Sequence, residues 1–217
     1  MESVNGLDVA ALKHVFAALA AAMEAHRDEL TELDGRMGDG DLGLTLSRGF
    51  SAVAEAAQAF EGDDCGALIA RMGQVMNKAA SSTMGTLLAM GMMRAGKGLE
   101  GKSRLETADM AAALTTAAEA IKRVGRADVG DKTMLDCLVP AANALTAKAE
   151  EGASLPEAWQ AAVAAAEAGL AETTDLPSKV GRAGWFGEKT RGIPDPGARA
   201  CVIMLQAVGG ALTKERS

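Results

Sequence analysis

The sequence has 217 residues and a formal net charge of −7, and 48% of its residues are hydrophobic but only 3% are aromatic. This hydrophobic content supports a full core and excludes a disordered chain. The acidic balance, without any basic stripe, excludes a nucleic-acid partner. A core built from Ala, Leu and Met, without Tyr, favours closely packed helices over sheets.

Membrane and redox signals point to a cytoplasmic protein. No apolar run reaches the roughly 18 residues of a membrane-spanning helix, and the N-terminus has no signal-peptide pattern. Cys65, Cys137 and Cys201 are scattered without metal-type spacing. We therefore expect buried free thiols in a reducing cytosol and no membrane partner.

Apolar residues recur at helical spacing along almost the whole chain, and clear two-residue alternation is absent. The pattern predicts eight helices with apolar stripes over residues 12–30, 50–60, 68–76, 87–92, 110–124, 134–145, 159–170 and 202–208. The first of them is expected to run continuously through Leu30, with His14 and His26 inside it as ordinary surface residues.

Start signals accompany several of these helices. Asp8 can cap the first, Ser154 and Glu157 form a capping box for the seventh, and Asp195 followed by Pro196 begins the eighth. Because no Pro- or Ser-rich linker divides the chain, we expect one all-α domain over residues 1–217.

Four connections are rich in glycine and polar residues. They are "LDGRMGDGDLG" (33–43), "AASSTMG" (79–85), "GRADVGDKT" (125–133) and "GRAGWFGEKTRGIPDPG" (181–197). They follow the first, third, fifth and seventh helices, and connections of an up-and-down bundle alternate between its two ends. All four are therefore expected at the same end, where they can form one composite site.

The first of these loops gathers Asp34, Asp39 and Asp41 among four glycines. Two carboxylates about 4 Å apart repel by about 4 kcal/mol at an effective dielectric of about 20, so holding them together requires a cation. Mg²⁺ prefers oxygen ligands and is usually held by carboxylates together with substrate phosphates. The alternative is a solvated acidic turn that ends the first helix. An EF-hand is excluded because Phe50 stands where its twelfth-position Glu belongs.

Two stretches approach a Walker A phosphate loop without matching it. In residues 125–133 Asp131 is inserted before Lys132 and no strand precedes the loop, and in residues 91–98 Gly98 replaces the Ser or Thr that binds the metal. Both lie inside a helical pattern, which argues against a P-loop NTPase.

The remaining loop features suit a phosphorylated ligand. Ser81, Ser82 and Thr83 precede a helix whose N–H groups favour an anion, although an ordinary N-cap is the alternative. Arg182 can stabilise a transferring phosphoryl group, or belong to a solvated charged loop around Trp185. Met134 can lie against a purine or simply in the core. Together these features describe two Mg²⁺ ions, a di- or triphosphate and a cation that closes over it.

Three motifs in register, "DGRMGDGDLG", "GDKTMLD" and "GRAGWFGEKTRGIPDPGA", resemble the L subunit, or nucleotide-binding domain, of dihydroxyacetone kinases over residues 7–212. The resemblance implies an eight-helix antiparallel up-and-down barrel with ADP or ATP held at one end through two Mg²⁺ ions. It assigns the metals to Asp34, Asp39 and Asp41, which with Arg182 form the expected catalytic set. The nucleotide contacts that it implies are Leu42, Gly43, Thr45, Ser82, Thr83, Met84, Gly125, Met134, Arg182, Asp195, Pro196 and Gly197.

Three positions depart from the family pattern. Leu42 stands where the family usually has His, Thr45 where it usually has Asn, and Met84 where its phosphate loop usually has Ser.

The family's K domain, which binds the ketone covalently through a His, is missing from this sequence. Two functions therefore remain open: the phosphoryl-transfer subunit of a dihydroxyacetone or related ketose kinase acting with a K-type partner, or a nucleotide-binding regulatory module without turnover. The phosphate donor is either exchanged ATP or a phosphotransferase-system protein that rephosphorylates resident ADP.

Overall fold

The computed structural model describes residues 6–214, so residues 1–5 and 215–217 of the expected domain lie outside the described residues. Within that range the all-α class is confirmed. The helices are α1 (Val9–Ala25), α2 (Arg27–Gly35), α3 (Leu42–Gln58), α4 (Cys65–Ala79), α5 (Thr83–Gly98), α6 (Thr107–Gly125), α7 (Leu135–Glu150), α8 (Leu155–Thr173) and α9 (Pro196–Lys214). Two short 3-10 helices, η1 (Ala183–Trp185) and η2 (Gly187–Thr190), precede α9.

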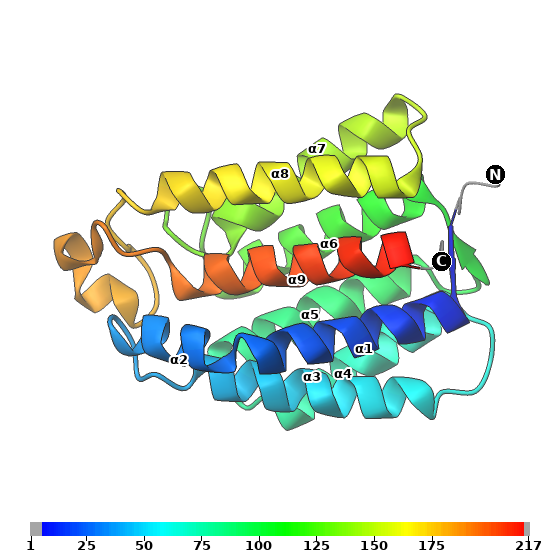
Figure 1. Ribbon diagram of the computed structural model, residues 1–217, viewed down its shortest axis with the longest axis horizontal. Coiled ribbons are helices and arrows are strands. Elements are labelled where there is room, and N and C mark those ends of the chain that lie inside the picture. Colours follow the sequence, from blue (N-terminus) through cyan, green and yellow to red (C-terminus); the bar gives the residue numbers. More distant parts are fainter. Residues whose placement is uncertain (1–5, 215–217) are drawn as a thin grey trace.

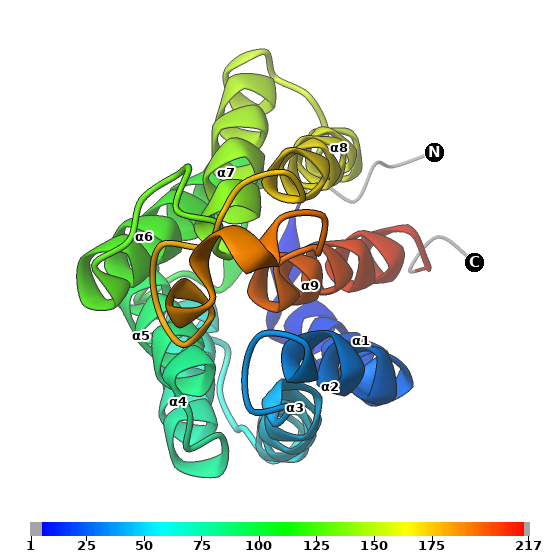
Figure 2. The ribbon, with the colours of Figure 1, turned by 90° about the vertical axis from the view of Figure 1, so that its left-hand side faces the viewer.

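The helices pack in a closed ring. From α3 to α9 each helix contacts the next one along the chain, α3 and α9 both contact α1, and α2 lies on α3. Figure 2 views this ring from one end, where the segment that holds η1 and η2 crosses in orange. In Figure 1 the same segment and the loop after α2 lie at the end opposite to β1 and the last turn of α9.

The expected continuous first helix is wrong at His26, where α1 ends and α2 begins. The His26 N–H group still donates to the Ala22 carbonyl oxygen, but its backbone leaves helical geometry at φ −102° and ψ 10°. Its ring nitrogen Nδ1 lies 2.6 Å from a carboxylate oxygen of Glu29 and so joins the start of the new helix. Residues 6–214 therefore hold one more helix than the apolar pattern predicts, and the additional helix α2 leads into the acidic loop.

A small sheet was not predicted either. Leu7–Asp8 (β1) pairs antiparallel with Arg104–Leu105 (β2), next to the start of α1. Two residues per strand are too few to produce a recognisable alternation in the sequence. The expected helix starts are confirmed: Asp8 accepts the Ala11 N–H at 2.9 Å, Ser154 and Glu157 form the capping box of α8, and α9 begins at Pro196.

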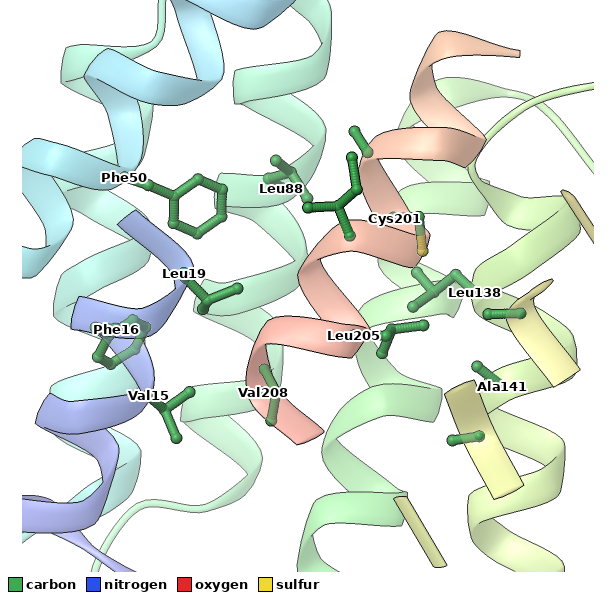
Figure 3. Packing of buried hydrophobic residues seen from close by; sticks show 14 of the residues in the cluster. Val15, Phe16, Leu19, Phe50, Leu88, Leu138, Ala141, Cys201, Leu205 and Val208 are labelled. Carbon is green, nitrogen blue, oxygen red and sulfur yellow. The ribbon is translucent and has the colours of Figure 1, made fainter. Parts of the chain in front are cut away.

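Small and flexible side chains fill the centre of the ring. Figure 3 shows Phe16 and Leu19 of α1, Leu88 of α5 and Leu205 of α9 among the buried side chains of one hydrophobic cluster. The indole N–H of the buried Trp159 donates to the Leu205 carbonyl oxygen at 2.8 Å, which ties α8 to α9. All three cysteines are buried free thiols, as expected. Of the helices between residues 6 and 214, none is long and apolar enough to cross a membrane.

Candidate nucleotide and metal site

Glycines allow the loop between α2 and α3 to fold back over Asp34. A Cβ atom at Gly38 would lie 2.4 Å from the Asp34 Oδ1 atom, so the backbone passes too close for any side chain. Gly40 has φ +71°, a left-handed conformation that glycine adopts without strain. This tight turn is what places Asp39 and Asp41 beside Asp34.

Asp34 also fixes the start of α3. Its Oδ2 atom accepts the N–H groups of Asp41 at 3.0 Å and Leu42 at 3.3 Å, two of the donors that a helix N-terminus leaves without an intrahelical acceptor. Among the described residues, Asp41 occupies the N-cap position of α3 without capping it through its own side chain. The Asp41 carboxylate therefore does not cap the helix that it precedes.

The three carboxylates converge. Asp34, Asp39 and Asp41 each offer an oxygen atom, and these atoms lie within 4.8 Å of one another. The guanidinium of Arg182, from the loop after α8, forms an ion pair with Asp39. Oxygen ligands at this spacing suit a divalent cation such as Mg²⁺, and Arg182 stands next to the charge that such an ion would neutralise.

A cavity of about 320 Å³ lies beside these carboxylates. Its walls come from all four glycine-rich loops, which confirms that they meet at one end of the bundle. It collects most of the expected site residues: Asp34, Asp39, Asp41, Leu42, Ser82, Thr83, Met84, Gly125, Met134, Arg182, Asp195, Pro196 and Gly197.

The lining of the cavity combines charged and apolar residues. The acidic loop and Arg182 supply the charges, whereas Leu87 of α5 and Ile121 of α6 supply apolar surface together with Met84 and Met134. Sequence analysis missed Leu87 and Ile121 because their helical spacing is the same as that of core residues. Such a combination suits a ligand with one apolar ring and one anionic group.

The start of α5 faces the same cavity. Ser82 is its N-cap, and the Ser82 hydroxyl accepts the Gly85 N–H at 3.1 Å, so the ordinary capping role is present. Thr83 and Met84 supply the first N–H groups of the helix, which have no intrahelical acceptor. An anion at this point would therefore meet both backbone donors and the positive end of the helix dipole.

Gly43 and Thr45 are expected nucleotide contacts that do not belong to the lining of the cavity. A Cβ atom at Gly43 would lie 1.9 Å from the Arg27 carbonyl oxygen, so this glycine lets α2 and α3 touch through their backbones. Thr45 lies one turn into α3, where its N–H donates to the Asp41 carbonyl oxygen at 2.9 Å. The direct contact of either residue with a nucleotide stays a prediction.

Asp195 is buried at the start of α9. Its Oδ2 atom accepts the Ala198 N–H at 2.8 Å, as an N-cap does. Burial raises the pKa of this carboxyl from its ordinary 3.8 to about 7, while the hydrogen bond from Ala198 and the charge of Lys132 oppose the rise. Lys132, which the sequence pointed to only as part of an imperfect Walker A loop, is buried as well and lines the cavity.

Comparison with known proteins identifies the family. The model of the DAK2 domain matches residues 36–210, which is most of the chain. The chain belongs to the DAK2 domain family.

Relatives of this DAK2 domain include kinases and kinase subunits. It is 32% identical to the PEP-dependent dihydroxyacetone kinase, ADP-binding subunit DhaL, of Escherichia coli, over 82% of this chain and 84% of that protein. It is 35% identical to an L-erythrulose kinase of Pectobacterium atrosepticum, over 95% of this chain but only 36% of that protein. The chain therefore spans about a third of this longer relative.

Solved structures agree with the fold. The dihydroxyacetone kinase of C. freundii in complex with AMP-PNP and Mg²⁺ superposes on the DAK2 domain with a TM-score of 0.75 and 27% sequence identity. The match covers 93% of this chain and 34% of that one.

The raised pKa of Asp195 predicts a pH dependence of stability. Between about pH 4 and pH 7 the folded protein keeps this carboxyl protonated while the unfolded chain ionises it, so the free energy of unfolding falls as the pH rises. Asp195→Asn keeps an N-cap acceptor and removes the titration. We expect thermal melts from pH 4 to pH 8 to show the wild type losing stability relative to Asp195→Asn as the pH rises. A constant difference between the two proteins would contradict the assignment.

Proposed function

We propose that this protein binds Mg-ADP or Mg-ATP in the cavity and transfers the phosphoryl group as one subunit of a dihydroxyacetone or related ketose kinase. The observation that carries the proposal is the convergence of three carboxylates within 4.8 Å of one another beside a cavity with an apolar wall. The C. freundii kinase in complex with AMP-PNP and Mg²⁺, and the E. coli relative named as an ADP-binding subunit, support the same ligands.

In this proposal each part of the site has one task. Asp34, Asp39 and Asp41 hold two Mg²⁺ ions, which when bound neutralise charge on the phosphates. The N–H groups at the start of α5 donate to a phosphate oxygen, and Met134 packs against the base. Arg182, already beside Asp39, stabilises the charge that develops on the transferring phosphoryl group.

The acceptor sugar needs a second protein part. The resemblance to dihydroxyacetone kinases implies a histidine that binds the ketone, and none of the described residues lining the cavity is a histidine. Trp185 and Phe186 stand close to Arg182 in the chain, and they are 87% and 44% exposed. Exposed aromatic residues are enriched where proteins associate. We propose that a K-type ketose-binding subunit docks here, in the cytoplasm, and that residues 1–217 act as one domain.

Metal-dependent nucleotide binding is the first prediction. A ligand present at about a hundred times its dissociation constant adds roughly 2.7 kcal/mol to the stability of the folded state. Mg-ADP should therefore raise the melting temperature by about 5–10 °C, and ADP with EDTA should not. Asp39→Asn should abolish the shift, whereas Asp63→Asn, an exposed change at the other end of the bundle, should keep it. Equal shifts with and without metal would refute the metal assignment.

Dependence on a partner is the second prediction. Holding the acceptor in line with phosphorus is worth about 7 to 11 kcal/mol of the barrier, so we expect no turnover unless a K-type subunit holds the sugar. Mg-ATP with dihydroxyacetone or erythrulose should give no product with this protein alone, and rapid product once a K-type subunit is added.

Three other outcomes would separate the alternatives. Rapid turnover by the chain alone would contradict the proposal that the kinase needs a separate ketose-binding subunit. Activity that requires a phosphotransferase-system protein in place of ATP would identify that protein as the donor. Mg-ADP binding without turnover in any mixture would favour the regulatory module, with Leu42 and Met84 as the first residues to restore to the family pattern.

A further inference from the structure

The segment that carries Arg182 has almost no apolar core of its own. We call residues 174–192 the closing loop, because the Gly192 N–H donates to the Thr174 carbonyl oxygen at 2.8 Å and ties its two ends together. All of these residues are described, and the two that are buried are Ser178 and Thr190, both polar. Something other than hydrophobic burial therefore holds this loop in place across the end of the bundle (Figure 2).

The side chain of Lys132 fills the centre of the closing loop. Its Nζ atom donates to the carbonyl oxygens of Leu176 and Thr190, both at 2.8 Å, and of Thr174 at 3.2 Å. The residue is only 1% exposed. A buried ammonium group is costly unless its charge and donors are satisfied, and here one ammonium satisfies carbonyls from both ends of the loop.

These contacts leave Lys132 unsuited to bind a phosphate itself. An ammonium group has three N–H donors, and the three carbonyl oxygens use them all. The lysine of a Walker A loop instead keeps its donors for the β- and γ-phosphates. Although residues 125–133 resemble such a loop, Lys132 therefore has a different role.

The backbone that presents Lys132 is itself fixed. Lys132 has φ +61°, which is uncommon for a residue other than glycine. The buried Asp136 carboxylate accepts the N–H groups of Gly130 at 2.5 Å and Thr133 at 2.7 Å, and so anchors this turn to the start of α7. A second link is the Lys179 N–H group, which donates to the Asp131 carbonyl oxygen at 3.2 Å.

We propose that Lys132 is a positioning residue: its ammonium group holds the closing loop against the turn that precedes α7, so that Arg182 stays beside Asp39 and the transferring phosphoryl group. The catalytic part of this proposal rests on the proposed function, whereas the structural part does not. The three hydrogen bonds of Lys132 join both ends of the loop, so removing them should loosen the segment as a unit. Arg182 would then no longer be held beside Asp39, although its own side chain is unchanged.

Hydrogen exchange tests the structural part directly. In Lys132→Met the amides of the closing loop, including those of Lys179 and Gly192, should exchange about tenfold faster or more, because hydrogen bonds to a charged group are lost. Lys13→Met is the matched control: its Nζ atom also donates to backbone carbonyls, those of Gln58 at 3.3 Å and Phe60 at 2.9 Å, at the other end of the bundle. This control should leave exchange in the closing loop unchanged. Unchanged exchange in Lys132→Met, or equal acceleration in every helix, would overturn the proposal.

A double-mutant cycle tests the catalytic part, in the complete mixture with a K-type subunit and Mg-ATP. Lys132→Met should lower kcat while the dissociation constant of Mg-ADP changes only a few-fold. Arg182→Ala should then cost much less in the Lys132→Met background than in the wild type, because residues in one network are not additive. Additive losses would mean that Lys132 acts only on stability and would overturn the positioning role. No turnover by the wild-type mixture would instead count against the proposed function, and the exchange experiment alone would then decide whether Lys132 holds the loop.

Discussion

The mutual repulsion of three carboxylates is the constraint on which the site depends. Asp34, Asp39 and Asp41 lie close enough for their oxygen atoms to share one cation, and the fold offsets the cost of that proximity in two ways. Asp34 directs one oxygen atom to the first N–H groups of α3, so part of its charge meets the positive end of that helix. Asp39 meets the guanidinium of Arg182, which reaches it from a loop more than a hundred residues further along the chain. Because both contacts hold the carboxylates in place, a metal would find its ligands already assembled.

The rest of the architecture places Arg182 beside the acidic loop, although the two are far apart in the sequence. Helices that run to and fro return every second connection to the same end, which is why four loops far apart in sequence line one cavity. The closing loop lies last among them and lacks an apolar core, so its position depends on the buried Lys132 instead. The acidic loop is paired with Arg182, and Lys132 binds both ends of the segment that carries Arg182. The apolar residues of the cavity lining are left to the ligand.

Much of this arrangement could be predicted from the sequence, because it follows from local rules. Helical spacing gives the all-α class, the capping signals at Asp8 and Ser154 give helix starts, and the alternation of loops gives one composite site. The break at His26 could not be predicted, since the apolar spacing continues through it and only the backbone of this one residue leaves helical geometry. The role of Lys132 could not be predicted either. Its partners are backbone carbonyls more than forty residues away, and every residue has a carbonyl, so the residue types do not identify these partners.

Counting bound metal ions is the most direct test of the account. Mn²⁺ takes the same oxygen ligands as Mg²⁺ and can be measured by equilibrium dialysis. With saturating ADP, the account predicts that each wild-type chain binds two ions and that Asp34→Asn binds fewer while its helix content stays the same. If the wild type holds no more metal than its bound ADP carries in solution, or if Asp34→Asn binds as many ions as the wild type, the three carboxylates are not a metal site and the central claim is wrong.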